Sequence, residues 1–407
     1  MNSLVRFLRE EKCPACGHHV AVPFLDPSLQ PLATVAWPLS ADEAEAMQQL
    51  PLDFVRCVEC GHVFNAAFEY TRVPYSRKPH RMFNKGINWS ENIQTMGRKI
   101  LRRFSNPPHA VEIGHGDGSF LMGLAKEMPG GKYTGFDPYG INFTEIENVQ
   151  FRTSLFEAKI HLPEIRPDLI ISRHVLEHLI DPLEFIQGLS FAAACIGIQP
   201  ILYIEVPCID RAVSAWRTVD FYYEHNSQFT SASFQKMLRR CGVETEEIGH
   251  IYDGEVIYGF ARLGVCQKHI RNAKCSISFR NQVREAELRI QKQVDELYHC
   301  GKTICIWGGT GKSAAFINRY KLDAKRFPLV VDSDQDKAGT YVPGTGQLIR
   351  FRDYLIEHPV QILIIPPQWR AKDILREMEQ IGIRAEQILI EHNGCLTDYR
   401  KEDHPYK

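Results

Sequence analysis

The most chemically suggestive residues near the start of the chain are two pairs of cysteines. Cys13 and Cys16 stand in CPACGHH, Cys57 and Cys60 stand in CVECGHVF, and forty residues separate the two pairs. Two thiolates from each pair can complete a tetrahedral four-sulfur shell, and Zn²⁺ is the usual occupant of such a shell. Because a closed shell leaves no position for a substrate, we expect a structural metal site. The alternative is four free thiols.

A glycine-rich turn is the second feature with chemical potential. The stretch VEIGHGDGSFL holds Gly114, Gly116 and Gly118, which follow a predicted buried strand and precede a predicted helix. Glycines permit a sharp turn and the close approach of a ligand at the carboxyl edge of a sheet. Asp137, nineteen residues after Gly118, ends the next predicted strand and is placed to accept the hydroxyls of a ribose. A nucleoside-containing cofactor is therefore expected, and a nicotinamide dinucleotide is one alternative.

A cluster of acid–base side chains lies in the stretch DFYYEHNSQFT, residues 220–230. Tyr222, Tyr223, Glu224 and His225 are consecutive, and all three residue types can move or hold protons in an active site. With a reference pKa of about 6.5, a histidine is largely neutral near physiological pH and ready to accept a proton. The alternative is an aromatic loop that packs at a junction between domains.

Two histidines in SRHVLEHL have the spacing of a helical metal site, because His174 and His178 are four residues apart. A role for His178 in lining an active site, or simple packing, are the competing interpretations.

The stretch GGTGKS, residues 308–313, resembles a phosphate-binding loop but lacks its first glycine, since Ile306 occupies that position. ATP hydrolysis is therefore not expected. The turn and Lys312 can still hold an anion with backbone N–H groups. A structural turn without a ligand is the alternative.

Strands and helices must position these residues, and they alternate along the chain. Buried strands are predicted at 110–114, 132–137, 149–153, 167–173 and 200–207, with helices between them, which predicts a parallel sheet covered on both faces. A long amphipathic helix is predicted near 277–299, and a second alternation follows it. The α/β fold class is therefore expected twice. The expected domains are a loop-rich metal-binding module at 1–77, a central domain at 78–275, a connecting helix at 276–300 and a second α/β domain at 301–407.

Composition excludes several functional classes. Of 407 residues, 44% are hydrophobic and 24% are charged, which is typical of a globular protein. The formal net charge of −1 offers no general attraction to nucleic acid or to an anionic membrane. No apolar run of membrane-spanning length occurs, and the N-terminus lacks the apolar core of a signal peptide. We therefore expect a cytoplasmic protein without a nucleic-acid or membrane partner.

The motifs together resemble a known enzyme family. Residues 110–190, with Glu112 to Gly118 and the later SRHVLEHLIDP, resemble class I S-adenosylmethionine (SAM) methyltransferases. The order of a four-cysteine module, a SAM domain, an EVP…EH segment and a C-terminal Rossmann-like domain is similar to that of the sugar C-methyltransferases. Those enzymes act on nucleotide-linked keto-deoxysugars, and the resemblance covers nearly the whole chain. It implies a nucleotide-linked sugar substrate, SAM as cofactor and structural Zn²⁺.

The resemblance also implies roles for the cluster near residue 225. Tyr222, Glu224 and His225 keep the family's Tyr-His-Glu-His pattern, whereas Tyr223 replaces a histidine and Gln228 replaces a tyrosine. Methylation at carbon requires an enolate, so His225 is the expected base and Tyr222 the expected donor to the enolate oxygen. Glu224 is expected to orient His225. The two replacements are expected to mark a different substrate.

The remaining implied roles are cofactor and substrate binding. The residues expected to bind SAM are Glu112, Gly114, Gly116, Gly118, Asp137 and His174. The residues expected to contact the substrate are Tyr75, His178, Tyr223 and Lys312. Two alternatives stay open: an O- or N-methyltransferase on the same scaffold, and a non-catalytic protein that binds zinc and SAM.

Overall fold

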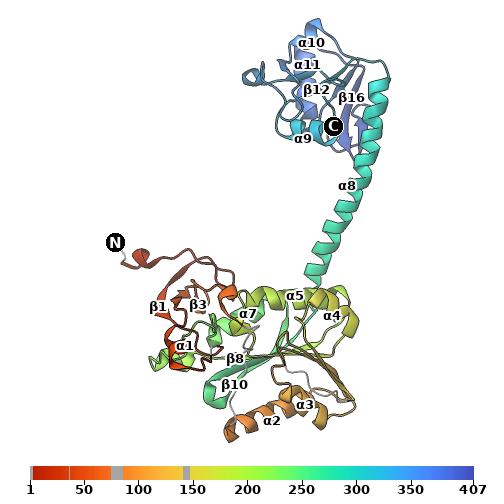
Figure 1. Ribbon diagram of the computed structural model, residues 1–407. Helices are drawn as coiled ribbons and strands as arrows, with labels where there is room; N and C mark the ends of the chain where they lie inside the picture. The colour runs from red at the N-terminus through yellow and green to blue at the C-terminus, as the bar shows by residue number, and fades with distance from the viewer. Residues whose placement is uncertain (1–2, 36, 75–85, 141–146) are drawn as a thin grey trace. The chain divides into compact units, whose positions relative to one another are not determined.

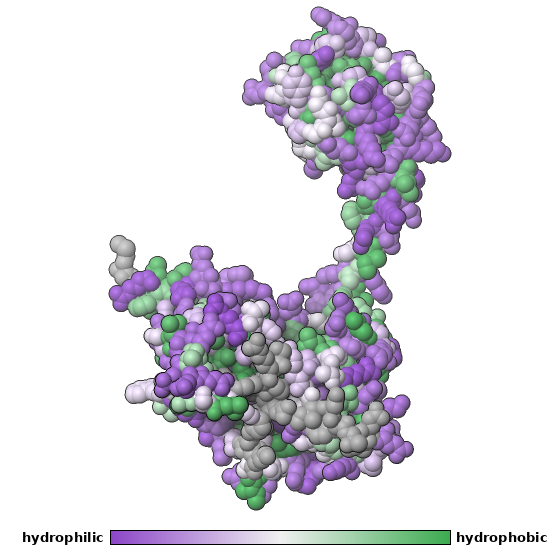
Figure 2. Space-filling model, in the orientation of Figure 1, coloured by the Kyte–Doolittle hydropathy of each residue, from purple (hydrophilic) through white to green (hydrophobic). Residues whose placement is uncertain are grey.

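The chain forms two compact units. The computed structural model describes residues 3–35, 37–74, 86–140 and 147–407. Met1–Arg271 make up one unit and Asn272–Lys407 the other (Figure 1). Within the described ranges no helix has the length and apolar character that crossing a bilayer requires. Polar residues cover most of the molecular face shown in Figure 2.

A four-stranded antiparallel sheet organises the N-terminal residues, for which we expected mostly loop. Its order is β1-β2-β3-β9. The strands are β1 (Ala21–Gln30), β2 (Leu50–Cys57), β3 (Val63–Asn65) and β9 (Ser227–Gln228). Helix α1 (Ala41–Glu45) lies between β1 and β2, and 3-10 turns occur before β1 at Ser3–Phe7 and after β3 at Tyr70–Arg72. Strand β1 escaped prediction because it contains two prolines and is mostly solvent-exposed along its second half.

The last strand of this sheet comes from a distant part of the chain. In β9, Gln228 pairs with Val63 and Ser227 pairs with Phe64. The pairing holds residues 222–226, which precede β9 directly, against the N-terminal module. The acid–base cluster is therefore positioned by the first sheet as well as by the second.

A seven-stranded sheet forms the centre of the first unit, in the order β10-β11-β8-β7-β4-β5-β6. Its strands are β4 (His109–Ile113), β5 (Lys132–Phe136), β6 (Val149–Arg152), β7 (Leu169–Arg173), β8 (Ile201–Pro207), β10 (Glu244–Ile251) and β11 (Val256–Arg262). The strands β8-β7-β4-β5-β6 are parallel and lie within two residues of the predicted positions. The antiparallel strands β11 and β10 extend the sheet beyond β8 and were not predicted.

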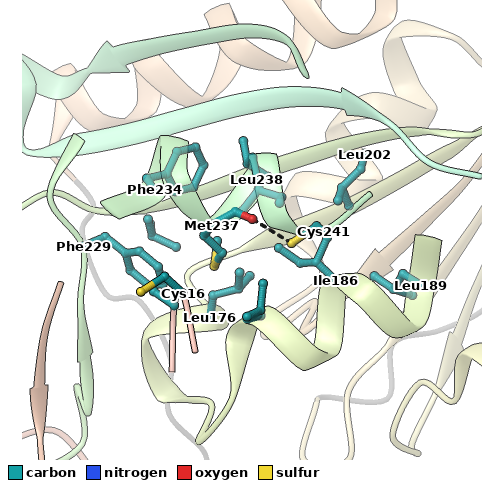
Figure 3. Close-up of a cluster of buried hydrophobic side chains, with 14 of the residues drawn as sticks. Cys16, Leu176, Ile186, Leu189, Leu202, Phe229, Phe234, Met237, Leu238 and Cys241 are labelled. Atoms are coloured by element: carbon teal, nitrogen blue, oxygen red, sulfur yellow. Dashed lines mark hydrogen bonds between the residues drawn. The ribbon is translucent and has the colours of Figure 1, made fainter. Parts of the chain in front are cut away.

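Helices cover both faces of the central sheet. The helices are α2 (Ile87–Leu101), α3 (Ser119–Glu127), α4 (Ala158–Ile165), α5 (Pro182–Cys195), α6 (Asp210–Ser214) and α7 (Ser231–Arg240), with 3-10 turns at Leu176–His178 and Tyr252–Gly254. Helices α2 and α3 bury their apolar side chains with Ala110 and Ile171 of the sheet. Helices α4, α5 and α7 pack on the other face with Val111 and Ile170 (Figure 3). This alternation of successive strand residues between two faces is the period-two pattern of a strand buried on both sides.

The second unit contains a six-stranded sheet in the order β14-β13-β12-β15-β16-β17, in which only β17 is antiparallel to its neighbour. Its strands are β12 (Ile304–Trp307), β13 (Val330–Asp332), β14 (Ile349–Phe351), β15 (Ile362–Ile364), β16 (Gln387–His392) and β17 (Cys395–Asp398). Its helices are α8 (Gln267–His299), α9 (Lys312–Arg319), α10 (Tyr354–Glu357) and α11 (Ala371–Ile381), with 3-10 turns at Gln335–Lys337 and Gln368–Arg370. Helix α8, expected from residue 276, begins at Gln267 and reaches into both units. The predicted second α/β fold is thus present.

Candidate functional site

The four cysteines form one buried cluster. Sγ of Cys13 lies 3.7 Å from Sγ of Cys60, and Sγ of Cys16 lies 3.6 Å from Sγ of Cys57. A tetrahedral Zn²⁺ with bonds of about 2.3 Å separates its sulfurs by about 3.8 Å, whereas a disulfide needs about 2.05 Å. The cluster therefore has the dimensions of a four-thiolate metal shell and not of two disulfides.

Both cysteine pairs sit in the same kind of tight turn. The Gly17 N–H donates to the Cys13 carbonyl at 2.8 Å, and the Gly61 N–H donates to the Cys57 carbonyl at 3.0 Å. Each glycine has a positive φ, 71° and 76°, a conformation that disfavours any residue with a Cβ. Cys16 also packs against the core between α5 and α7 (Figure 3). The cluster thus joins the N-terminal module to the central sheet.

The glycine-rich turn opens into a large cavity. The cavity has a volume of about 810 Å³, and its lining includes Glu112, Gly114, Gly116 and Asp137. A Cβ at Gly114 would lie 2.4 Å from Cγ2 of Val175, so the turn tolerates no side chain there. A Cβ at Gly116 would meet nothing within 4 Å, which leaves its backbone open for a ligand. Gly118, with φ of 68°, is the N-cap of α3.

Asp137 and Glu112 present carboxylates to this cavity. The Asp137 carboxylate accepts hydrogen bonds from the N–H groups of Gly116 at 3.0 Å and Tyr139 at 2.8 Å. It therefore braces the glycine turn and still has lone pairs for hydroxyl donors. Glu112 is 2% exposed, and burial raises its pKa to about 8. Its Oε2 is buried without a hydrogen-bond partner among the described residues, as expected of an atom that awaits a ligand donor.

A network of buried charges lies behind Glu112. Arg173 donates through Nε to Oε1 of Glu205 at 2.7 Å, and its Nη1 lies 4.0 Å from Oε1 of Glu112. The Tyr203 hydroxyl donates to Oε2 of Glu205 at 2.5 Å. Burial opposes the ionisation of Glu205, but Arg173 and His174 outweigh it and lower the pKa of Glu205 to about 2. Glu205 is therefore an anion that anchors the network.

His174 lies in this network and has the unusual φ of 51°. Its Nδ1 lies 3.4 Å from Oε1 of Glu177, and its Nε2 lies 3.3 Å from Oε1 of Glu205. Burial opposes its protonation, but the two carboxylates outweigh burial and raise the pKa of His174 to about 9. His174 lines the cavity, as expected of a cofactor-binding residue, yet its ring nitrogens face protein carboxylates.

Tyr222 and His225 form the centre of the acid–base cluster. The Tyr222 hydroxyl lies 2.8 Å from Nε2 of His225, and the two rings are 4.4 Å apart between centroids. Burial raises the pKa of Tyr222 well above its usual value, so its hydroxyl stays protonated. The His225 ring meets the His178 ring edge-on at 4.9 Å, and His178 lines the large cavity. The structure thus brings Tyr222, His225 and His178 together beside the cavity.

The Glu224 carboxylate binds the backbone of the N-terminal module, which is not the role we expected for it. Its carboxylate accepts hydrogen bonds from the backbone N–H groups of Ala33, Thr34 and Val35 at 2.7 to 3.1 Å. The carbonyl of Glu224 accepts from Nδ1 of His178 at 2.8 Å. The side chain is fully buried, because a turn at residues 223–224 directs it toward the N-terminal module. The expectation that the Glu224 carboxylate orients His225 is therefore corrected: the carboxylate holds a loop.

The acidic group near the histidine pair is Glu177, which sequence reasoning did not assign to the site. One ligand-type atom from each of Glu177, His178 and His225 lies within 4.8 Å of the others. Glu177 is 1% exposed, and its oxygens lack a hydrogen-bond partner among the described residues apart from the ion-pair contact with His174. The sequence signal was its position beside His178. His174 and His178 do not form the helical metal pair, since His174 points to carboxylates.

Tyr223 and Gln228, the two departures from the family pattern, are buried. Tyr223 is 0% exposed, its hydroxyl accepts from the N–H of Glu69 at 2.9 Å, and its ring lies 5.1 Å from that of Phe68. Gln228 donates through Nε2 to the carbonyls of Asp220 and His225, both at 3.0 Å. The expected substrate contact of Tyr223 is therefore corrected, because its side chain is enclosed in protein. Both residues brace the loop.

The other expected substrate residues lie elsewhere. Tyr75 is outside the described residues. Lys312, in the second unit, lines a smaller cavity of about 240 Å³ with Thr310, Asp332 and Arg370. Its Nζ lies 5.1 Å from the centroid of the Trp369 ring. Gly308 and Gly311, both with positive φ, form the turn before α9. A cation, hydroxyls and an aromatic face at the carboxyl ends of parallel strands are groups that bind nucleotides.

Comparison with known proteins gives two matches to family models. Residues 88–248 match a model described as a methyltransferase domain, and residues 267–390 match a model described as a C-methyltransferase C-terminal domain. The first match contains the glycine turn, the acid–base cluster and all of the residues that line the large cavity except Tyr70. The second begins at the first residue of α8 and includes Lys312. No curated protein matches the chain.

Several solved structures are similar to part of the chain. The O-methyltransferase family protein from Burkholderia thailandensis is 14% identical, with 43% of this chain and 56% of that chain covered and a TM-score of 0.32. Human N-acetylserotonin methyltransferase in complex with SAM is 17% identical, with 48% and 63% covered and a TM-score of 0.33. The plantazolicin methyltransferase BpumL is 16% identical, with 43% and 83% covered and a TM-score of 0.32.

Proposed function

We propose that this chain, a SAM-dependent methyltransferase with a C-methyltransferase C-terminal domain, methylates a carbon next to the ketone of a nucleotide-linked deoxysugar. The match at residues 267–390 supports methylation at carbon. The observation that carries the proposal is the contact of 2.8 Å between the Tyr222 hydroxyl and Nε2 of His225, beside the large cavity. An imidazole and a protonated hydroxyl can supply the base and the oxyanion donor that enolisation of a ketone needs.

The large cavity is the proposed site of SAM. SAM supplies, when bound, an electrophilic methyl group that accepts the electron pair of a nucleophile. Asp137 would accept the ribose hydroxyls, and Glu112, whose Oε2 lacks a partner among the described residues, would accept a donor from the amino-acid part. The open backbone at Gly116 allows the close approach that a nucleoside needs.

The proposed chemistry on the substrate begins with a proton transfer. His225 takes the proton from the carbon next to the ketone, and the electron pair of the broken C–H bond moves into the enolate. Tyr222, which stays protonated because burial raises its pKa, donates a hydrogen bond to the enolate oxygen. His178, held by its bond to the Glu224 carbonyl, limits where the substrate lies. The remaining task of the enzyme is to position the nucleophilic carbon in line with the methyl group.

Two further parts of the proposal concern metal and nucleotide. The four-cysteine cluster would hold a structural Zn²⁺, which the sulfur–sulfur distances of 3.6 and 3.7 Å support. The cavity of the second unit would take the nucleotide, with Lys312 facing phosphate and Trp369 available for stacking. Tyr75 is a further proposed substrate contact.

Deuterium exchange tests the enolate step directly. The full-length protein would be incubated in deuterated buffer, without SAM, with a nucleotide-linked ketodeoxyhexose. The proposal expects deuterium at the carbon next to the ketone and, once isotope-labelled SAM is added, a new methyl group at that carbon. An O- or N-methyltransferase would leave that carbon unlabelled and would also methylate the corresponding alcohol. Absence of exchange on ketosugars that are nevertheless methylated would overturn the enolate mechanism.

A further inference from the structure

A second cluster of metal-binding side chains lies away from the four cysteines. Cys208 follows β8, Asp210 is the first residue of α6, and His250 belongs to β10. One ligand atom from each lies within 4.8 Å of the others. None of the three is among the described residues that line the large cavity. The cluster therefore belongs neither to the proposed methyl-transfer site nor to the four-cysteine shell.

The distances in this cluster are close to those of a metal shell. Sγ of Cys208 lies 3.8 Å from Nε2 of His250. A tetrahedral Zn²⁺ with Zn–S of about 2.3 Å and Zn–N of about 2.05 Å separates these two atoms by about 3.6 Å. Cys208 is 3% exposed, whereas Asp210 and His250 are exposed, so one side of the cluster is open to ions from solvent.

The ligand types favour zinc over harder cations. A thiolate and an imidazole are ligands that Zn²⁺ prefers, while Mg²⁺ and Ca²⁺ prefer oxygen. One thiolate and one carboxylate would balance the charge of a divalent ion. The hydroxyl of Ser231, the first residue of α7, lies 4.0 Å from Sγ of Cys208.

The arrangement does not suit a serine nucleophile. The Ser231 hydroxyl lies 2.5 Å from Oδ2 of Asp210 and 2.9 Å from Nε2 of His250. In a serine–histidine–aspartate relay the carboxylate binds the second imidazole nitrogen and leaves the serine to the first. Here the carboxylate and the imidazole both bind the same hydroxyl. The hydroxyl is therefore engaged on two sides and not activated by one base.

We propose that Cys208, Asp210 and His250 bind a second divalent metal ion of the zinc class. Three protein ligands leave a fourth position for water or for the Ser231 hydroxyl. The ion would link the end of β8, the start of α6 and β10. The backbone of Cys208 forms an isolated parallel β-bridge with that of Phe229, and the Ile209 N–H donates to the Phe229 carbonyl at 2.9 Å. The ion would thereby also steady the segment that follows the acid–base cluster.

Metal counting on the full-length protein tests this site. Wild type, His250→Ala and Cys208→Ser would be loaded with Zn²⁺, passed through gel filtration and analysed by mass spectrometry for bound zinc. Both variants should hold one equivalent per chain less than wild type. This difference is the readout whatever the four-cysteine cluster holds. The exposed residues Cys195 and His299 provide matched controls, and Cys195→Ser and His299→Ala should keep the wild-type count.

Cobalt substitution gives an independent signal. If the four-cysteine cluster is loaded as well, Cys208→Ser should remove about one fifth of the thiolate-to-Co²⁺ charge-transfer absorption, since Cys208 supplies one of five thiolates. His250 is exposed, so His250→Ala should fold, and an unchanged thermal unfolding midpoint in chelator would verify this. Equal zinc content in wild type and His250→Ala, with a cobalt spectrum that Cys208→Ser leaves unchanged, would overturn the proposal.

Discussion

The Tyr222 hydroxyl lies 2.8 Å from Nε2 of His225, and the two residues are three positions apart around a turn. The turn directs Tyr223 and Glu224 into the protein and leaves Tyr222 and His225 half-buried. The backbone turn thus separates four consecutive polar residues into a buried pair that holds the loop in place and a half-buried pair that can contact a substrate. The half-buried pair is where chemistry is expected.

Replacement of either member of this pair should separate proton transfer from cofactor binding. His225→Asn should lower the rate of deuterium exchange at the substrate carbon by about 100-fold or more, because the base is lost. Tyr222→Phe should lower it by about 100-fold, because one donor to the enolate oxygen is lost. The affinity for SAM, measured by calorimetry, should stay within about twofold of wild type for both. Full exchange in His225→Asn would place the base elsewhere.

Glu224→Gln is expected to weaken folding more than chemistry. Oε1 of Glu224 accepts from three successive backbone N–H groups, and Oε2 also accepts from the first of them, that of Ala33. An amide removes the negative charge and places an NH2 donor against the Ala33 N–H. The free energy of unfolding should fall by about 1 to 3 kcal/mol in a denaturant titration, the usual cost of unsatisfied buried groups. Glu45→Gln, an exposed change in α1, should stay within about 0.5 kcal/mol of wild type. Loss of exchange without loss of stability would restore a catalytic role to Glu224.

The elements that could be predicted from sequence are those whose pattern is local. Four of the five parallel strands, β4, β5, β7 and β8, are short stretches rich in buried apolar residues, and the cysteine pairs have the spacing of a metal site, so the sequence indicated both. Strand β10 was missed because none of its residues is buried and three of them are glutamates. Strand β11 was missed although VIYGFAR is a buried and mainly apolar run. Strand β9 was missed because two residues carry no period, and only its partner β3 defines it.

Side-chain roles depended on contacts that sequence does not contain. Glu224 and Tyr223 looked like site residues because they adjoin His225, yet their partners are Val35 and Glu69, far away in sequence. Glu177 was passed over because its importance comes from burial beside His178. Adjacency in sequence therefore grouped Tyr223 and Glu224 with His225, whereas both side chains bond to backbone groups far away in sequence.

The pH dependence of stability should reveal the buried ion pairs of His174. Its pKa is about 9 in the folded protein and 6.5 ordinarily, because Glu177 and Glu205 outweigh the effect of burial. Stabilisation from a raised pKa is complete below the unfolded value and is lost as pH rises through the folded value. The free energy of unfolding should therefore fall between pH 6.5 and about 9, by at most about 3 kcal/mol.

His174→Asn isolates this contribution, since asparagine tolerates the positive φ of this position better than most residues. The difference in unfolding free energy between wild type and His174→Asn should shrink as pH rises over that interval. Chemical denaturation at several pH values measures it. A difference that does not change with pH would show that His174 is uncharged in the folded protein.

Gly114→Ala should abolish most SAM binding through a steric clash. The added Cβ would lie 2.4 Å from Cγ2 of Val175, and the φ of 79° disfavours any side chain. The SAM dissociation constant should rise by about tenfold or more, equivalent to about 1.4 kcal/mol. Gly114→Ala should raise the SAM dissociation constant by a smaller factor in a Val175→Ala background than in wild type, because Val175→Ala removes the clashing Cγ2. Gly188→Ala, in α5 with open space around its Cβ, should leave SAM binding unchanged.

Lys312→Ala should distinguish nucleotide recognition from methyl transfer. Lys312 lines the smaller cavity with Asp332 and Arg370, and hydrogen bonds to a charged phosphate contribute about 1.5 to 3 kcal/mol. KM for the nucleotide-linked ketodeoxyhexose should therefore rise roughly tenfold or more, while kcat and KM for SAM stay close to wild type. Lys325→Ala, an exposed change in the same unit, should alter neither constant. If Lys312→Ala lowered kcat with KM unchanged, Lys312 would act on the reaction and not on nucleotide binding; if both constants stayed unchanged, the nucleotide would bind elsewhere.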